Sequence, residues 1–177
     1  MYANREMRFY ACVGFNGCYW PASSTTDGSY RLQTVKYCMD GNAGKYAGTV
    51  GSDNYTPTGY VIKKYISSYD AWRGNSSERY EKGFPIIRYA EILLSYAEAL
   101  NQNGKTAEAC KYLNMTRRRG FGYQTTETSP VDLQTTDKAQ FALMVEQERR
   151  VELAFENHRW FDLIRTGRAV EVMRSKG

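Results

Sequence analysis

The sequence is poor in the residues that build common metal sites. It has one histidine, His158, and four cysteines among 177 residues, and no two cysteines form a Cys-x-x-Cys pair. A single histidine cannot complete a Cys/His zinc pattern, so we expect no metal site and no cofactor. Cys110 falls on a predicted helix face as a small core residue. The spacing leaves open whether a disulfide forms among Cys12, Cys18 and Cys38 in an oxidising compartment.

Long apolar runs are also lacking. No run approaches the roughly eighteen apolar residues that a membrane span needs, and we find no basic-then-apolar leader with a small-residue cleavage site. Hydrophobic residues make up 42% of the chain and charged residues 24%, which is ordinary for a globular protein. At 177 residues, one domain with a sizeable core is expected.

Signatures of catalysis are missing as well. There is no G-x-S-x-G elbow that would supply a serine partner for His158, and no glycine-rich phosphate loop. Two carboxylate pairs exist, Glu148 with Glu152 and Glu91 with Glu98. Residues four or seven apart on one helix point the same way, whereas glycosidase carboxylates face each other across a sugar. Nearby arginines would also lower the pKa of a carboxyl. We expect buried ion pairs, not an enzyme.

The net charge of +5 permits an acidic partner but does not identify one. The densest basic cluster, residues 117–119, lies at the end of a predicted helix, where cations complement the helix dipole. Nucleic-acid binding would require a basic stripe on a recognisable reader fold, and none is found. We expect no nucleic-acid partner.

Residues 1–83 are predicted to form a loop-rich segment with minor β content. Gly, Ser, Thr, Asn and Tyr dominate there, and these residues favour turns and loops. Residues 8–15 partly alternate between apolar and polar side chains, and residues 59–66 are rich in β-branched and aromatic types, so both ranges favour strands. A long loop connects them, and such loops are usually functional or poorly ordered.

Residues 84–177 are predicted to be helical, beginning with a hairpin over residues 84–120. Pro85 suits the first turn of a helix that ends at Asn103 and Gly104. A second helix is expected over residues 106–119, with Gly120 after it. The small residues in this hairpin match the tetratricopeptide pattern, and a single such repeat needs neighbours to cover its faces. The predicted apolar positions are Ile86, Ala90, Leu93, Leu94, Ala97, Leu100, Ala109, Cys110 and Leu113.

A polar linker over residues 121–136 precedes closing helices over residues 137–176, with a break at residues 156–158. Glu148 and Glu152 fall within the apolar stripe of the first closing helix. Two carboxylates on a buried face are unfavourable unless cations pair with them. We predict an ion-pair network of Glu148 and Glu152 with arginines of the same stretch, and a core position for Trp160. The stripe comprises Phe141, Met144, Val145, Val151 and Phe155, and the arginines are Arg149, Arg150, Arg159, Arg165 and Arg168.

Aromatic residues are abundant, at 14% of the chain with 15 tyrosines. Flat aromatic faces stack on the apolar faces of sugar rings, and nearby polar groups bind hydroxyls. Many of these aromatics lie in the loop-rich segment, where the alternative role is local packing. Trp20 and Trp72 are the candidate carbohydrate contacts.

Three stretches resemble the SusD/RagB family, in the order in which that family carries them. They are MRFYACVGFNGCYW at residues 7–20, FPIIRYAEILLSYAEALNQNGK at residues 84–105, and ERRVELAFENHRWFDLIRTG at residues 148–167. Asn157 and His158 stand where a glycine and a variable residue are common. The resemblance implies a mostly α, SusD-like helical fold with a tetratricopeptide-like hairpin. It also implies that the chain is the carboxy-terminal portion of a longer protein.

The resemblance further implies a non-catalytic, glycan-binding or nutrient-binding lipoprotein on the outer surface of a Bacteroidetes cell. Such a protein delivers its ligand to a TonB-dependent outer-membrane transporter and reaches the membrane through a lipid anchor on its amino-terminal part. The alternative is a protein-interaction module that docks a transporter without binding a ligand of its own. Neither the residues nor the resemblance identifies the glycan.

Overall fold

The computed structural model describes residues 2–20, 31–34, 58–67, 71–73, 76–78 and 82–174, with the backbone alone at 71–73 and 76–78. The chain divides into two compact units. The loop-rich unit comprises Met1–Arg5 and Phe9–Phe84, and the helical unit comprises Glu6–Arg8 and Pro85–Gly177. Helices dominate the described residues, and the strands are short, so the predicted mostly α fold with minor β content is confirmed.

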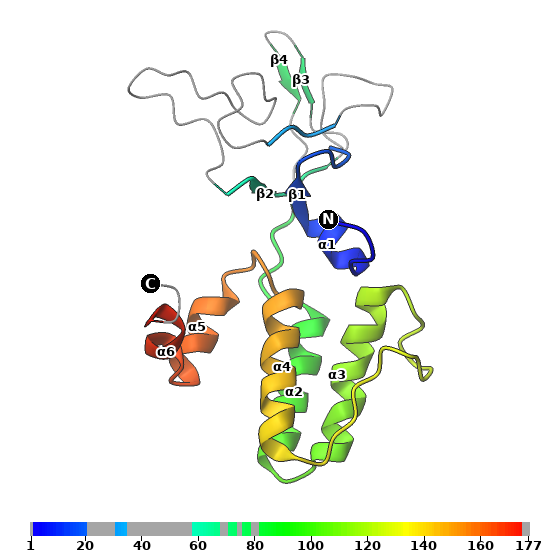
Figure 1. The fold of residues 1–177 in the computed structure, drawn as a ribbon, viewed down its shortest axis with the longest axis vertical. Coiled ribbons are helices and arrows are strands. Elements are labelled where there is room, and N and C mark those ends of the chain that lie inside the picture. Colours follow the sequence, from blue (N-terminus) through cyan, green and yellow to red (C-terminus); the bar gives the residue numbers. More distant parts are fainter. Residues whose placement is uncertain are drawn as a thin grey trace. The chain divides into compact units, whose positions relative to one another are not determined.

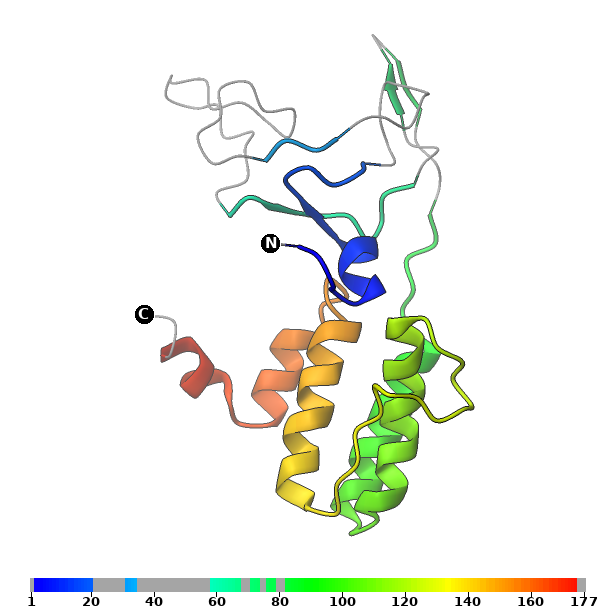
Figure 2. The ribbon, with the colours of Figure 1, turned by 45° about the vertical axis from the view of Figure 1, so that its right-hand side comes forward.

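The helical unit is built on three helices that lie side by side (Figure 1). They are α2 (Tyr89–Gln102), α3 (Thr106–Phe121) and α4 (Lys138–Glu152). Two shorter helices follow: α5 (His158–Arg165) lies beside α4, and α6 (Ala169–Arg174) lies against α5 (Figure 2). The predicted helical hairpin corresponds to α2 and α3, and α4 packs against both. Their shared core consists of Leu94, Ala97, Leu100, Ala109, Cys110, Leu113, Phe141 and Val145.

The predicted start of the first helix was wrong. Arg88 has extended backbone angles and α2 begins after it, so Pro85 does not occupy a first helical turn. Ile86 is therefore outside the helix, with 85% of its surface exposed. The end was predicted correctly, because Gly104 adopts the left-handed φ of 76° that a residue with a side chain rarely takes. At the end of α3 that role belongs to Gly122, at φ 83°, and Gly120 lies inside the helix.

The end of α4 also differs from the prediction. Asp137 caps its start by accepting hydrogen bonds from the backbone N–H groups of Ala139 and Gln140. The helix ends at Glu152, so the break before α5 spans residues 153–157. Phe155, at φ 67° and 39% exposed, therefore does not belong to the apolar stripe of α4. Trp160 is 55% exposed, which contradicts its predicted place in the core.

Residues 122–137 are attached to α3 by specific hydrogen bonds. The side-chain amide of Asn114 donates to the Leu133 carbonyl and accepts from the Leu133 N–H, both at 2.9 Å. Arg118 donates to both carboxylate oxygens of Asp132 at 2.6–2.7 Å. The segment predicted as a polar linker is thus part of the packed unit.

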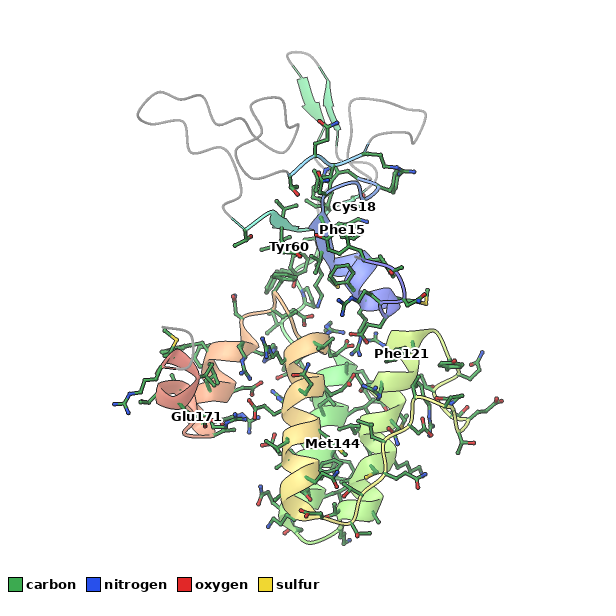
Figure 3. The ribbon with its side chains drawn as sticks, in the orientation of Figure 1. Phe15, Cys18, Tyr60, Phe121, Met144 and Glu171 are labelled. Carbon is green, nitrogen blue, oxygen red and sulfur yellow. The ribbon has the colours of Figure 1, made fainter. Side chains whose placement is uncertain are left out.

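In the described part of the loop-rich unit, the helix and the strands are short. β1 (Val13–Phe15) pairs antiparallel with β2 (Tyr60–Ile62), and β3 (Ala71–Arg73) pairs antiparallel with β4 (Ser76–Glu78). The predicted strand at residues 8–15 is correct only for β1, because residues 7–12 form the helix α1 (Met7–Cys12). β2 is likewise shorter than predicted. Rings of Tyr2, Phe9, Tyr10, Phe15 and Tyr60 contact one another (Figure 3 labels Phe15 and Tyr60).

Candidate functional site

Glu148 and Glu152 lie one turn apart on α4, and each is only 3% exposed. One guanidinium nitrogen, Nη1 of Arg8, donates to both, at 2.6 Å to Glu148 and 2.9 Å to Glu152. Arg8 belongs to the short amino-terminal part of the helical unit. Two like charges this close are tolerated when a shared cation and hydrogen bonds offset their burial.

Further arginines complete the network around Glu152. Arg88 donates to Glu152 at 3.0 Å and also binds both carboxylate oxygens of Glu156, at 2.7 and 2.8 Å. Arg119 donates to the same oxygen of Glu152 as Arg88. Glu152 on α4 therefore binds arginines from three other segments of the helical unit: Arg8, Arg88 before α2, and Arg119 near the end of α3.

The charge state of Glu152 follows from this arrangement. Burial alone would raise its pKa. This effect is outweighed by one hydrogen bond each from Arg8, Arg119 and Arg88 and by the charge of Arg119, so the pKa lies below its ordinary value. Burial would lower the pKa of Arg8, yet Glu148 and the hydrogen bonds to its carboxylate partners raise it. Both groups are thus charged at neutral pH. A general acid requires the opposite direction for its carboxyl pKa.

The predicted network exists with different partners. Arg149 binds Asp162 at 3.0 Å, and Arg159 binds Glu146 at 3.0 Å, so neither bonds to Glu148 or Glu152. Arg150 is exposed and makes no ion pair with any described residue. The expectation that arginines of the closing stretch would neutralise Glu148 and Glu152 was therefore wrong.

Sequence reasoning missed the arginines that reach these carboxylates. Arg8 and Arg88 come from stretches far from α4 in the sequence, although both lie within the blocks that resemble the SusD/RagB family. Arg119 was attributed to the helix dipole. In the structure it binds Glu152, and Arg117 approaches Glu148 at 3.4 Å. A rule that assigns partners to buried carboxylates from those motif arginines would have found Arg8 and Arg88.

Of the predicted carbohydrate contacts, Trp20 is half-buried in the loop-rich unit. Its ring lies against β1, since a Cβ on Gly14 would come within 2.8 Å of Trp20 Cζ3. Trp72 has its backbone in β3, and its side chain lies outside the described residues. The thiols of Cys18 and Cys110 are free, while Cys38 is outside the described residues.

Several hollows in the helical unit are large enough for small ligands. One of about 350 Å³ lies among α2, α4 and α5, and its lining includes Arg165 with the two carboxylates that Arg165 binds, Glu98 and Asp162. Another of about 520 Å³ lies among α4, α5 and α6. A third, of about 550 Å³, is lined by aromatic residues that include Trp160 and Phe161. These volumes fall in the usual range for ligand pockets.

Within the described ranges, no group of three or more His, Cys, Asp or Glu side chains is arranged to hold a metal ion. None of the helices described has the length and apolar character required to cross a membrane.

Comparison with known proteins places the chain in a family. The model of the SusD family matches residues 1–177, and the chain belongs to that family. SusD-like protein P38 of Formosa agariphila is 43% identical over 89 residues, which cover 50% of this chain and 18% of that protein. SusD-like protein P2 of the same organism is 33% identical over 121 residues, covering 66% of this chain and 23% of that protein.

A solved structure agrees with this assignment. The crystal structure of a SusD-like protein from Bacteroides fragilis matches 92% of this chain with a TM-score of 0.67 and 29% identity. The match covers 28% of that protein's chain, so the present chain spans less than a third of each of these relatives. The expected SusD-like helical fold is thereby confirmed.

Proposed function

We propose that this chain takes part in non-catalytic binding of a glycan or another nutrient at the bacterial outer surface. In this proposal the protein delivers its ligand to a TonB-dependent outer-membrane transporter and is held at the membrane by a lipid anchor. The observation that carries the proposal is the match of the SusD family model to the whole chain. The proposal concerns the whole protein, because the match to this chain covers only 18% of SusD-like protein P38 and 28% of the solved SusD-like structure.

The arginine–carboxylate network supports the non-catalytic part of the proposal. Glu148 and Glu152 are buried among arginines and are engaged in holding segments of the fold together. The arginines around Glu152 favour its ionised form and lower its pKa. We assign them a structural role and place ligand contact elsewhere.

Trp20 and Trp72 are the proposed carbohydrate contacts of the loop-rich unit. The test is isothermal titration of the full chain with a panel of oligosaccharides, comparing wild type with Trp20→Ala and Trp72→Ala. Loss of one stacking ring should weaken binding about three- to tenfold. Tyr123→Ala is the control, because it removes an exposed aromatic ring of the helical unit that lines none of the hollows described above.

Two results would contradict the proposal. One is the absence of binding by the wild-type chain across the panel, with a near-ultraviolet circular dichroism spectrum showing that the chain is folded. The other is the appearance of new reducing ends in the bound oligosaccharide, which would mean hydrolysis. An equal loss in Trp20→Ala, Trp72→Ala and the control variant would remove Trp20 and Trp72 from the proposed contact surface and leave the binding function in place.

A second candidate function, docking of a protein partner, is favoured by the outer face of α2. Tyr89, Ile92 and Tyr96 lie at helical spacing on this face and are 71%, 51% and 47% exposed. An apolar stripe of this kind is typical of a helix that packs on another protein segment. Replacing Tyr89 and Ile92 by serine should abolish retention of the transporter in a pull-down while oligosaccharide binding persists. Retention unchanged by these substitutions would argue against this docking face.

A further inference from the structure

The cavity of about 520 Å³ among α4, α5 and α6 carries an excess of positive charge. Arg150, Arg159 and Arg168 line it together with a single acidic residue, Glu146, which leaves two more positive charges than negative ones. Glu171, outside the lining, approaches Arg168 Nε at 3.3 Å, but its side chain is 70% exposed and contributes little in water. The cavity is therefore complementary to an anion.

The arginines retain donors that could bind such an anion. Glu146 accepts from Arg159 Nη1 at 3.0 Å through one carboxylate oxygen and from Arg168 Nη1 through the other. A guanidinium carries five N–H donors, so each arginine has several left after this bond. The Arg150 guanidinium has no hydrogen bond or ion pair to any residue that the structure describes. Glu146 thus holds two guanidinium groups in place without exhausting their donors.

The rest of the lining suits a sugar ring beside the anionic group. Leu143 and Leu163 provide apolar surface, and Gln147 provides an amide that can bind a hydroxyl. Arginine forks bind carboxylate and sulfate groups through paired hydrogen bonds. A cavity of this volume accommodates one or two sugar rings.

We propose that this arginine cavity binds the anionic group, a carboxylate or a sulfate ester, of an acidic oligosaccharide. The inference rests on the proposed glycan-binding function and narrows it to a ligand class. It makes Arg150, Arg159 and Arg168 ligand-binding residues in addition to the aromatic contacts of the loop-rich unit. Glu146 is then a positioning residue, which orients two arginines and at the same time repels the ligand.

The test titrates the full chain with three matched oligosaccharides, one neutral, one containing uronate residues and one sulfated, and with inorganic sulfate alone. Arg150→Gln should weaken binding of the acidic oligosaccharides about tenfold, the usual effect of losing one charge-assisted hydrogen bond. Arg174→Gln is the matched control, because it removes an exposed arginine of α6 that does not line the cavity. Binding of the neutral oligosaccharide should be unchanged in both variants.

Glu146→Gln separates ligand binding from a purely structural role. Removal of the repelling carboxylate should strengthen binding of the acidic oligosaccharides several-fold and make that binding decline more steeply with salt, whereas Arg150→Gln should make the decline shallower. A residue needed only for structure would weaken binding instead. Loss of the near-ultraviolet circular dichroism signal in Glu146→Gln would mean that this variant is not folded. The comparison of Arg150→Gln with Arg174→Gln then decides by itself whether the cavity binds the acidic oligosaccharide.

Three outcomes would overturn the inference. Binding of the neutral but not the acidic oligosaccharides would refute the arginine cavity and leave the proposed function standing. Equal weakening by Arg150→Gln and Arg174→Gln would mean unspecific attraction by the net positive charge. Inorganic sulfate bound as tightly as the sulfated oligosaccharide would mean that the sugar contributes nothing. Failure of every oligosaccharide to bind would contradict the proposed function itself.

Discussion

The two units of this chain are stabilised in different ways. The helical unit buries a continuous apolar cluster between α2, α3 and α4 and adds a buried network of arginines and carboxylates. In the loop-rich unit, the described residues contribute contacts between half-exposed rings, such as Tyr2 with Phe15 at 4.3 Å between centroids, and short strand pairs. A repeating apolar pattern in the sequence therefore predicts the core of the helical unit. The ring contacts and strand pairs of the loop-rich unit join residues that no local sequence pattern connects.

The largest expected effect is the loss of core packing in the helical unit. Phe141 is fully buried, so Phe141→Ala should lower the free energy of unfolding by about 3–5 kcal/mol. Leu143→Ala is the control, because Leu143 is on the same helix and 61% exposed. Urea titration followed by far-ultraviolet circular dichroism measures both. Similar losses in the two variants would mean that the cluster is not the core of this unit.

The next largest effect concerns the buried network. Glu152→Gln leaves Arg8, Arg88 and Arg119 without their shared counter-charge, at a cost of about 3 kcal/mol. Glu171→Gln is the control, since Glu171 is 70% exposed and an exposed ion pair contributes about 0–1 kcal/mol. Chemical denaturation of both variants distinguishes a structural network from a surface one. A cost for Glu152→Gln as small as that of the control would contradict the structural assignment.

Acid should weaken the helical unit through the same carboxylates. Burial opposes ionisation of Glu152 and Asp162, but hydrogen bonds from Arg8 to Glu152 and from Arg149 to Asp162 hold each pKa below its ordinary value of 4.5 or 3.8. The stabilisation is complete above those values and is lost as pH falls through the lower folded-state values. The midpoint of thermal unfolding should therefore drop below about pH 4.5.

Glu152→Gln sharpens this test. Because glutamine does not titrate, the variant should lose less stability between pH 5 and pH 3 than wild type does. Parallel pH profiles of the two proteins would show that Glu152 has the same pKa in the folded and unfolded states. Thermal melts across this pH range provide the measurement.

The smallest effect belongs to the loop-rich unit. A Cβ on Gly14 would come within 2.6 Å of Val61 Cγ2 and 2.8 Å of Trp20 Cζ3, so Gly14→Ala should cost about 1–3 kcal/mol by overpacking. Gly83→Ala is the control, because nothing lies within 4 Å of its Cβ position. Tryptophan emission should shift in Gly14→Ala alone. An unchanged emission spectrum would mean that Trp20 does not pack on β1.

The sequence allowed the helices to be predicted where an apolar period is long and uninterrupted. Leu94, Leu113 and Phe141 were assigned to the core correctly because each lies on such a stripe. Trp160 and Ile86 were assigned to the core or its stripe by type and position, yet both are largely exposed. The apolar character of a side chain does not show whether another segment of this chain covers it.

The buried carboxylates were identified for the same reason that their partners were missed. Glu148 interrupts an apolar stripe, and this local anomaly signals a buried charge. Arg8, which bonds to it, lies at a sequence separation of 140 residues, and no local pattern connects the two. The arginine cavity was missed for a related reason, because Arg150, Arg159 and Arg168 meet only when α4, α5 and α6 pack together.

The measurement that tests the central claim most directly is a double-mutant cycle between Arg8 and Glu148. The claim is that the carboxylates of the closing motif stabilise the fold by binding arginines from distant segments. Unfolding free energies of Arg8→Met, Glu148→Gln and the double variant should be non-additive, with a coupling of about 1–3 kcal/mol. Additive losses would show that the two residues stabilise the protein independently and would contradict the claim.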